Sequence, residues 1–81
     1  MNLEAGEVQL QQQLLATSEE YRRLAAAHRA HAEELERLSR RPHLTESERF
    51  QEVTLKKKKL LLKDQMYSML QRYRKEMEVG S

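Results

Sequence analysis

Cysteine is absent from this 81-residue chain, which excludes disulfides, zinc sites built on thiolates, and cysteine nucleophiles. Glycine occurs twice, proline once and tryptophan not at all, so few positions interrupt a helix. Hydrophobic residues make up 38% of the chain and charged residues 35%, which is too little apolar mass for a thick core. Because a domain of this size buries only about 60% of its unfolded surface, we expect no deep pocket and no small-molecule substrate.

Long apolar runs are missing as well. The longest strongly apolar run is Leu60-Leu61-Leu62, which is far shorter than a membrane span. The first fifteen residues carry acids and a glutamine run, where a signal peptide needs a basic start and an apolar stretch. The sequence therefore predicts a cytoplasmic protein without a membrane partner.

The sequence contains no glycine-rich phosphate loop. None of its serines comes with both a plausible general base and an orienting carboxylate, as a nucleophilic serine requires. We therefore expect a protein that is not an enzyme and that carries no cofactor.

The residues that are abundant, namely Leu, Glu, Lys, Arg, Gln and Ala, are typical of long exposed helices. Strong punctuation occurs only around Pro42, which disfavours helix at the residue before it. Thr45 followed by Glu48 forms a capping box that restarts helix at residue 46. The sequence thus predicts an all-α antiparallel helical hairpin of coiled-coil type. Its parts are a helix over 18–39, a turn over 40–45, a second helix over 46–78 and a tail over 79–81.

The N-terminal arm, residues 1–17, is either a separate short helix or a continuation of the first long one. Thr17 is a suitable N-cap, and Glu20 is placed to reach back to it. We therefore expect a break or a bend near residue 17.

Residues spaced alternately by three and four form a coiled-coil seam on each long helix. Folding the chain back at 40–45 pairs positions whose numbers sum to about 88, so that both seams fit one register. The seam of the first helix is Leu10, Leu14, Thr17, Tyr21, Leu24, His28, His31, Leu35 and Leu38. The seam of the second is Phe50, Val53, Lys57, Leu60, Asp64, Tyr67, Gln71 and Arg74.

The second helix also carries another apolar stripe, nearly opposite its seam at about 100° per residue. Its members are Leu55, Leu62, Met66, Met69, Tyr73 and Met77. Leaving six large side chains in water is costly, because burial of each is worth about 1.5–3 kcal/mol. We therefore expect a second copy of the chain, or the N-terminal arm, to cover this stripe, and a homo-oligomer with a dimer as first choice.

The stretch Leu55-Lys56-Lys57-Lys58-Lys59-Leu60-Leu61-Leu62-Lys63-Asp64, followed by Met66 and Met69-Leu70, resembles the signature of the YdcH-like family of small bacterial proteins. Glu20-Tyr21-Arg22-Arg23-Leu24, with His28 and Leu35 after it, resembles the first long helix of that family. The resemblance covers roughly residues 18–71. It implies an antiparallel helical hairpin that tends to associate, a bacterial origin, and a domain whose function is unknown.

The polar residues of the predicted seam include His28, His31, Lys57 and Asp64. The two histidines and Asp64 could share a metal ion, but a structural site normally needs four ligands. We favour a polar layer that fixes the register of the two helices, as buried polar residues do in coiled coils.

Basic residues are concentrated in the second half of the chain. Residues 1–44 hold six basic and seven acidic side chains, and residues 45–81 hold nine and six. Lys56, Lys63 and Arg74 form a loose basic stripe that could contact nucleic-acid phosphates, although Glu52 is spaced to pair with Lys56.

Two functions remain open at this point. The favoured one is a non-enzymatic interaction or scaffold protein that associates with itself, or with another protein, through the second helix. The alternative is weak nucleic-acid binding by the basic side of that helix.

Overall fold

The computed structural model describes residues 5–79, which form three α-helices and no strand. These helices are α1 (Ala5–Thr17), α2 (Glu19–Ser39) and α3 (Glu46–Val79). The prediction of an all-α protein is confirmed, and the bounds of α2 and α3 lie within one residue of those expected. Residues 1–4 of the predicted arm and 80–81 of the predicted tail lie outside the described residues.

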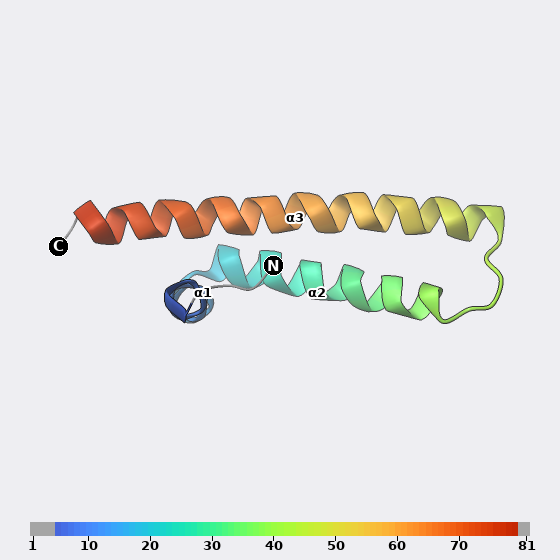
Figure 1. The fold of residues 1–81 in the computed structure, drawn as a ribbon, viewed down its shortest axis with the longest axis horizontal. Coiled ribbons are helices and arrows are strands. Elements are labelled where there is room, and N and C mark those ends of the chain that lie inside the picture. Colours follow the sequence, from blue (N-terminus) through green and yellow to red (C-terminus); the bar gives the residue numbers. More distant parts are fainter. Residues whose placement is uncertain (1–4, 80–81) are drawn as a thin grey trace.

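Helices α2 and α3 lie side by side and run in opposite directions (Figure 1). At 1.5 Å per residue, the 34 residues of α3 span about 51 Å and the 21 residues of α2 about 32 Å. The C-terminal part of α3 therefore extends past α2. Helix α1 crosses at this end, so that Figure 1 looks down its axis. The molecule measures 54 × 20 × 18 Å.

The start of α3 has the capping geometry that the sequence predicts. The Glu48 backbone N–H donates to Thr45 Oγ1 at 3.1 Å, and the Thr45 N–H donates to Glu48 Oε1 at 3.0 Å. Arg41 forms an ion pair with the same Glu48 side chain from the other side of the turn. Two backbone donors at the helix end are thereby satisfied.

The break between α1 and α2 falls at Ser18, which has extended backbone geometry and caps α2 by accepting from the Tyr21 N–H at 3.1 Å. The prediction of Thr17 as the cap, with Glu20 reaching back, is therefore wrong by one residue. Thr17 belongs to the last turn of α1, and its hydroxyl donates to the Gln13 carbonyl at 2.8 Å. Both residue types cap helices well, so the residue type alone does not show whether Thr17 or Ser18 is the N-cap of α2.

Arg22 stabilises the same break from the other side. Its Nη1 atom lies 2.9 Å from the Leu15 carbonyl oxygen and 3.2 Å from that of Ala16. A cation that donates to the last carbonyls of a helix satisfies free acceptors and complements the helix dipole. The Ser18 cap and the Arg22 side chain of α2 thus both stabilise the break between α1 and α2.

The inner stripe of α3 faces α2. Leu55 is buried at 8% exposure, and the other members are half-buried. Its members are Leu55, Leu62, Met66, Met69 and Tyr73. These residues were predicted as an oligomer or partner face, covered by a second copy or by the N-terminal arm, and the partner assignment is wrong for Leu55, Leu62, Met66 and Met69, which are buried or half-buried within the single chain. Only Met77 of the predicted set, which lies near the end of α3, is exposed.

The outer stripe of α3 lies opposite the inner stripe and includes the large apolar residues predicted for the seam, with Leu60 and Tyr67 at the edges of clefts shared with α2. It consists of Phe50, Val53, Leu60, Leu61 and Tyr67, all exposed. The face predicted as the buried seam is therefore exposed, and the face predicted for a partner is buried. The reason is that the predicted seam also contains Lys57 and Asp64, and burying charged groups is costly. The inner stripe buries only aliphatic, thioether and phenolic side chains instead.

The predicted register between α2 and α3 agrees with observed contacts, even though α3 packs on α2 through a different face from the one predicted. Gln51 Nε2 donates to Glu34 Oε1 at 3.3 Å, and Arg41 pairs with Glu48. The residue numbers of these pairs sum to 85 and 89, close to the expected 88.

Helix α1 covers the part of α3 that α2 does not reach. The Tyr73 hydroxyl donates to Gln13 Oε1 at 3.2 Å, and Arg74 forms an ion pair with Glu7 at 3.1 Å. Leu14 of α1 is buried as well, at 5% exposure. The sequence left open whether a second copy or the N-terminal arm packs on Tyr73. In the single chain, the N-terminal arm does.

Candidate interaction surface

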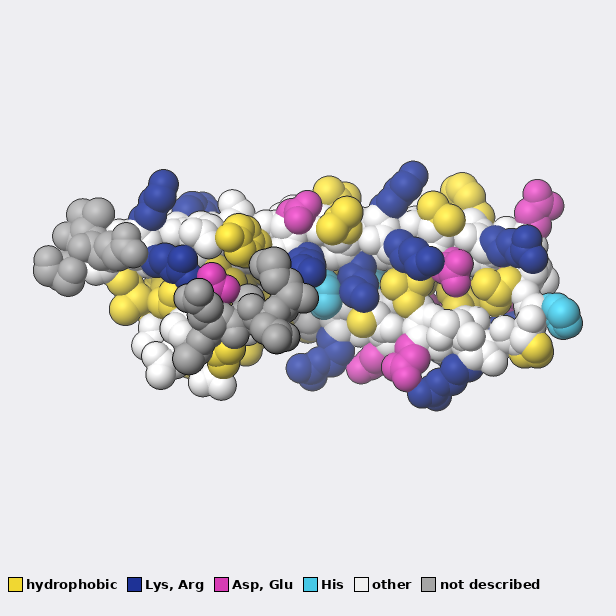
Figure 2. All heavy atoms as spheres, in the orientation of Figure 1, with side chains coloured by type: hydrophobic (Ala, Val, Ile, Leu, Met, Phe, Trp, Pro, Cys, Tyr) yellow, Lys and Arg dark blue, Asp and Glu magenta, His cyan; other side chains and the backbone are white. Residues whose placement is uncertain are grey.

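The outer stripe is the largest group of exposed apolar side chains on α3. Phe50 is 74% exposed, Leu61 63% and Leu60 59%. Figure 2 shows hydrophobic side chains standing out between charged ones along the upper edge of the molecule, where α3 lies. Exposed large apolar side chains that follow one side of a helix are candidates for a contact with a partner.

Lys57 and Asp64 lie within the outer stripe and are both exposed. They were predicted to form a buried layer with His28 and His31, which are half-buried on α2. The structure does not bring the four side chains together, because Lys57 lies on the far side of α3. Asp64 and His28 do line one cleft.

This junction cleft, of about 620 Å³, lies where the three helices meet. It includes Gln11 of α1, Tyr21 and His28 of α2, and Asp64 of α3. No group of three or more His, Asp or Glu side chains within residues 5–79 could hold a metal ion.

His28 has an environment that disfavours its charged form. Burial is the main cause that lowers its pKa below the ordinary 6.5, and the positive charges of Lys59 and Lys63 and neighbouring His31 add to it. The neutral imidazole is therefore the form that the folded chain favours.

Tyr21 is fully buried, at 0% exposure. Its hydroxyl has no hydrogen-bond partner among the described residues. Burial raises the pKa of the phenol above 10.0, and the Gln11 side chain offsets part of this rise without reaching hydrogen-bond geometry. The prediction that Tyr21 is a core residue is confirmed.

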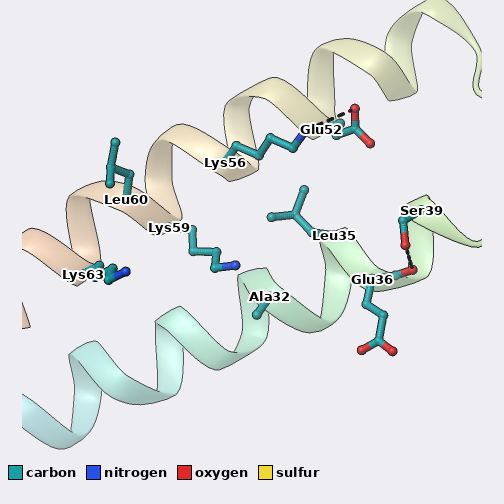
Figure 3. Close-up of a pocket in the computed structure, with 9 residues that line it drawn as sticks. All are labelled: Ala32, Leu35, Glu36, Ser39, Glu52, Lys56, Lys59, Leu60 and Lys63. Carbon is teal, nitrogen blue, oxygen red and sulfur yellow. Dashed lines mark hydrogen bonds and ion pairs between the residues drawn. The ribbon is translucent and has the colours of Figure 1, made fainter. Parts of the chain in front are cut away.

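A second cleft, of about 640 Å³, runs between α2 and α3 towards the turn, and three lysines reach it. Lys59 points towards α2, whereas Leu60 points away from it (Figure 3). We call this feature the lysine cleft and define it by Leu35, Glu36, Glu52, Lys56, Lys59 and Lys63.

Two of the cations predicted to contact nucleic acid are paired within the chain. Lys56 lies 3.8 Å from Glu52, and Arg74 lies 3.1 Å from Glu7. Lys63 reaches the lysine cleft, and so does Lys59, which the sequence reasoning did not single out. The signal for Lys59 was its spacing from Leu55 and Leu62, four and three residues away, which places it on their side of the helix.

None of the three described helices combines the length and the hydropathy that a bilayer span needs.

Comparison with known proteins gives a family match and no further match. The family described as a protein of unknown function (DUF465) matches residues 21–70, a range that takes in most of α2, the turn and about three quarters of α3. No curated protein and no solved structure matches the chain. The matched range contains the whole outer stripe and both clefts apart from Gln11. The chain belongs to the DUF465 family, to which the YdcH-like proteins also belong.

Proposed function

We propose that this protein is a non-enzymatic interaction or scaffold protein that associates with itself through the outer stripe of α3. The observation that carries the proposal is the exposure of five large apolar side chains along the outer side of α3, where Phe50, Val53 and Leu61 line none of the clefts that residues 5–79 form. The self-associating face is therefore opposite the one that the sequence pattern indicated.

Burial energetics support this assignment. Each large apolar side chain gains about 1.5–3 kcal/mol on full burial. From Phe50 to Tyr67 the stripe extends about 26 Å along the helix at 1.5 Å per residue. A small chain with a thin core of its own has much to gain from burying such a surface against a partner.

The proposal assigns no catalytic chemistry to the histidines or to the clefts. It also places the protein in the cytoplasm of a bacterial cell. Cell fractionation of the native host, with detection of the chain by an antibody, tests that location.

Light scattering of the purified chain tests self-association. We expect a mass of two chains, and we expect the double variant Leu60→Ser with Leu61→Ser to have the mass of one chain while keeping its helical circular dichroism. Gln65→Ser is the matched control, because Gln65 is exposed on α3 outside the outer stripe. A wild-type chain with the mass of one copy at high concentration would refute the proposal.

The lysine cleft favours nucleic-acid binding as a second candidate function. Lys56, Lys59 and Lys63 gather on one side of the hairpin, and clustered lysines release counterions when they neutralise phosphates. This function predicts binding of DNA or RNA at low salt, with an affinity that falls steeply as salt is added. Absence of binding at low salt would remove it and leave self-association untouched.

A further inference from the structure

The outer stripe carries two opposite charges as well as its apolar side chains. Lys57 and Asp64 are seven residues apart, which is two helical turns, so they lie on the same side of α3. Both are exposed, and neither forms an ion pair within residues 5–79. The face through which a second copy would bind thus has a positive and a negative position about 10 Å apart along the helix.

We propose that two copies of the chain pack their α3 helices antiparallel about a twofold axis near Leu60 and Leu61, with Lys57 of each copy paired to Asp64 of the other. This inference rests on the proposed function, because it specifies the geometry of the self-association described above. It adds the direction of the helices, the position of the axis and the residues that select both.

The charges select the antiparallel direction. In a parallel, in-register pair, Lys57 would face Lys57 of the other copy and Asp64 would face Asp64, so that both contacts would be repulsive. In an antiparallel pair centred between the two positions, each lysine faces an aspartate. A twofold axis generates that favourable pair twice, since a contact from residue i to residue j implies one from j to i.

The apolar residues fit the same axis. The midpoint between positions 57 and 64 falls between Leu60 and Leu61, so the leucines of both copies meet at the centre of the contact. Phe50 of one copy then lies within about one helical turn of Tyr67 of the other, because the two residues lie on opposite sides of the axis and their distances from it differ by four positions. The apolar residues of the two copies thus come together about the same axis as the charges.

Within residues 5–79, the side chains of this side of α3 stay exposed, with Asp64 and Tyr67 at the edge of the junction cleft. Helix α2 packs on the inner stripe, and α1 reaches the C-terminal end of α3 through Tyr73 and Arg74. Two chains joined in this way bring six helices together, and both α3 helices are central. Each hairpin keeps its own inner contacts unchanged.

Single cysteines test the direction and the axis, because the natural chain has none. A disulfide needs Cα atoms within about 7 Å, a separation that facing positions on packed helices can reach. We expect Leu61→Cys to form a covalent dimer on mild oxidation. Phe50→Cys is the matched control and should not, because an antiparallel pair centred near Leu61 separates its two copies by about 30 Å along the helix.

Exchanging the two charges in the otherwise unaltered chain tests the ion pairs. We expect Lys57→Asp and Asp64→Lys each to weaken dimerisation by about tenfold or more, and the double variant to restore most of it. Circular dichroism establishes that each variant remains helical.

The outcomes separate this inference from the proposed function. A wild-type dimer in which Phe50→Cys crosslinks as readily as Leu61→Cys, or in which the double charge variant is no better than the single ones, overturns the antiparallel geometry but leaves self-association standing. A wild-type monomer at all concentrations overturns both.

Discussion

Tyr21 is a fully buried side chain whose hydroxyl gains no hydrogen bond within the described residues. Removing a hydroxyl from water without a new partner costs free energy. The ring itself fills the junction of the three helices, so the residue combines a favourable apolar contribution with an unfavourable polar one.

Tyr21→Phe should therefore raise the free energy of unfolding by about 1 kcal/mol, measured by urea denaturation. Tyr73→Phe is the matched control, because it removes a hydroxyl that donates to Gln13, and it should leave stability unchanged or lower it by up to about 1 kcal/mol. A clear loss of stability in Tyr21→Phe would contradict the description of an unpartnered hydroxyl.

His28 links stability to pH. The folded chain lowers its pKa below 6.5, with burial as the main cause and Lys59 and Lys63 next, so the unfolded chain binds the proton more readily than the folded chain does. The contribution of His28 to the free energy of unfolding is therefore fully present above pH 6.5. It is lost as the pH falls through the pKa that His28 has in the folded chain.

We expect the melting temperature to decrease on acidification below pH 6.5, and to decrease less in His28→Gln. Thermal melts followed by circular dichroism across this range measure both slopes. Identical slopes in the variant and in the wild type would show that other groups dominate the acid response.

Capping also acts at the scale of single residues, and its energetic effect can be measured. Ser18→Ala should lower the free energy of unfolding by about 1 kcal/mol, because it removes the acceptor of the Tyr21 N–H. Thr17→Ala should cost less, since the Thr17 hydroxyl only donates to a carbonyl of its own helix. If Thr17→Ala lowered the free energy of unfolding more than Ser18→Ala in a denaturation experiment, Thr17 would be the N-cap.

At the scale of elements, α3 is a helix with two apolar faces. The sequence predicted the lengths of α2 and α3, the capping box at Thr45 and the register between the helices, because these depend on local signals and on spacing. It did not predict which face of α3 turns inward, since both stripes fit the same register. The predicted seam contained Lys57 and Asp64, and the cost of burying these charges outweighed the regularity of the pattern.

The two faces should respond differently to truncation. Leu55→Ala removes a buried side chain of the inner stripe and should destabilise the single chain by about 2–5 kcal/mol. Leu61→Ala truncates a side chain that is 63% exposed and should leave that stability nearly unchanged. Urea denaturation below the concentration of self-association makes the comparison, and equal losses would contradict the assignment of the faces.

The position of α1 shows a further limit of sequence reasoning at this scale. A break near residue 17 was predictable from local residue types. The crossing of α1 over the end of α3 depends on contacts such as Arg74 with Glu7, which are 67 positions apart. Such distant pairings have no local signal, so the choice between a separate arm and a continuous helix remained open.

At the scale of the whole molecule, the protein is a thin body of 54 × 20 × 18 Å in which α3 spans nearly the full length. One side of that helix is covered by α2 and α1, and the other carries the outer stripe. In our account α3 joins two units: its inner stripe holds the hairpin together and its outer stripe holds two hairpins together. The proposed interaction surface could be predicted from the sequence only as far as the helix that contains it.

Sedimentation equilibrium of the unaltered chain over a wide range of concentrations tests this central claim most directly. The account predicts that the mass rises with concentration from that of one 9.7 kDa chain to twice that value and then stays constant, as a closed twofold pair requires. A mass that stays at one chain throughout, with the outer stripe left in water, would contradict it.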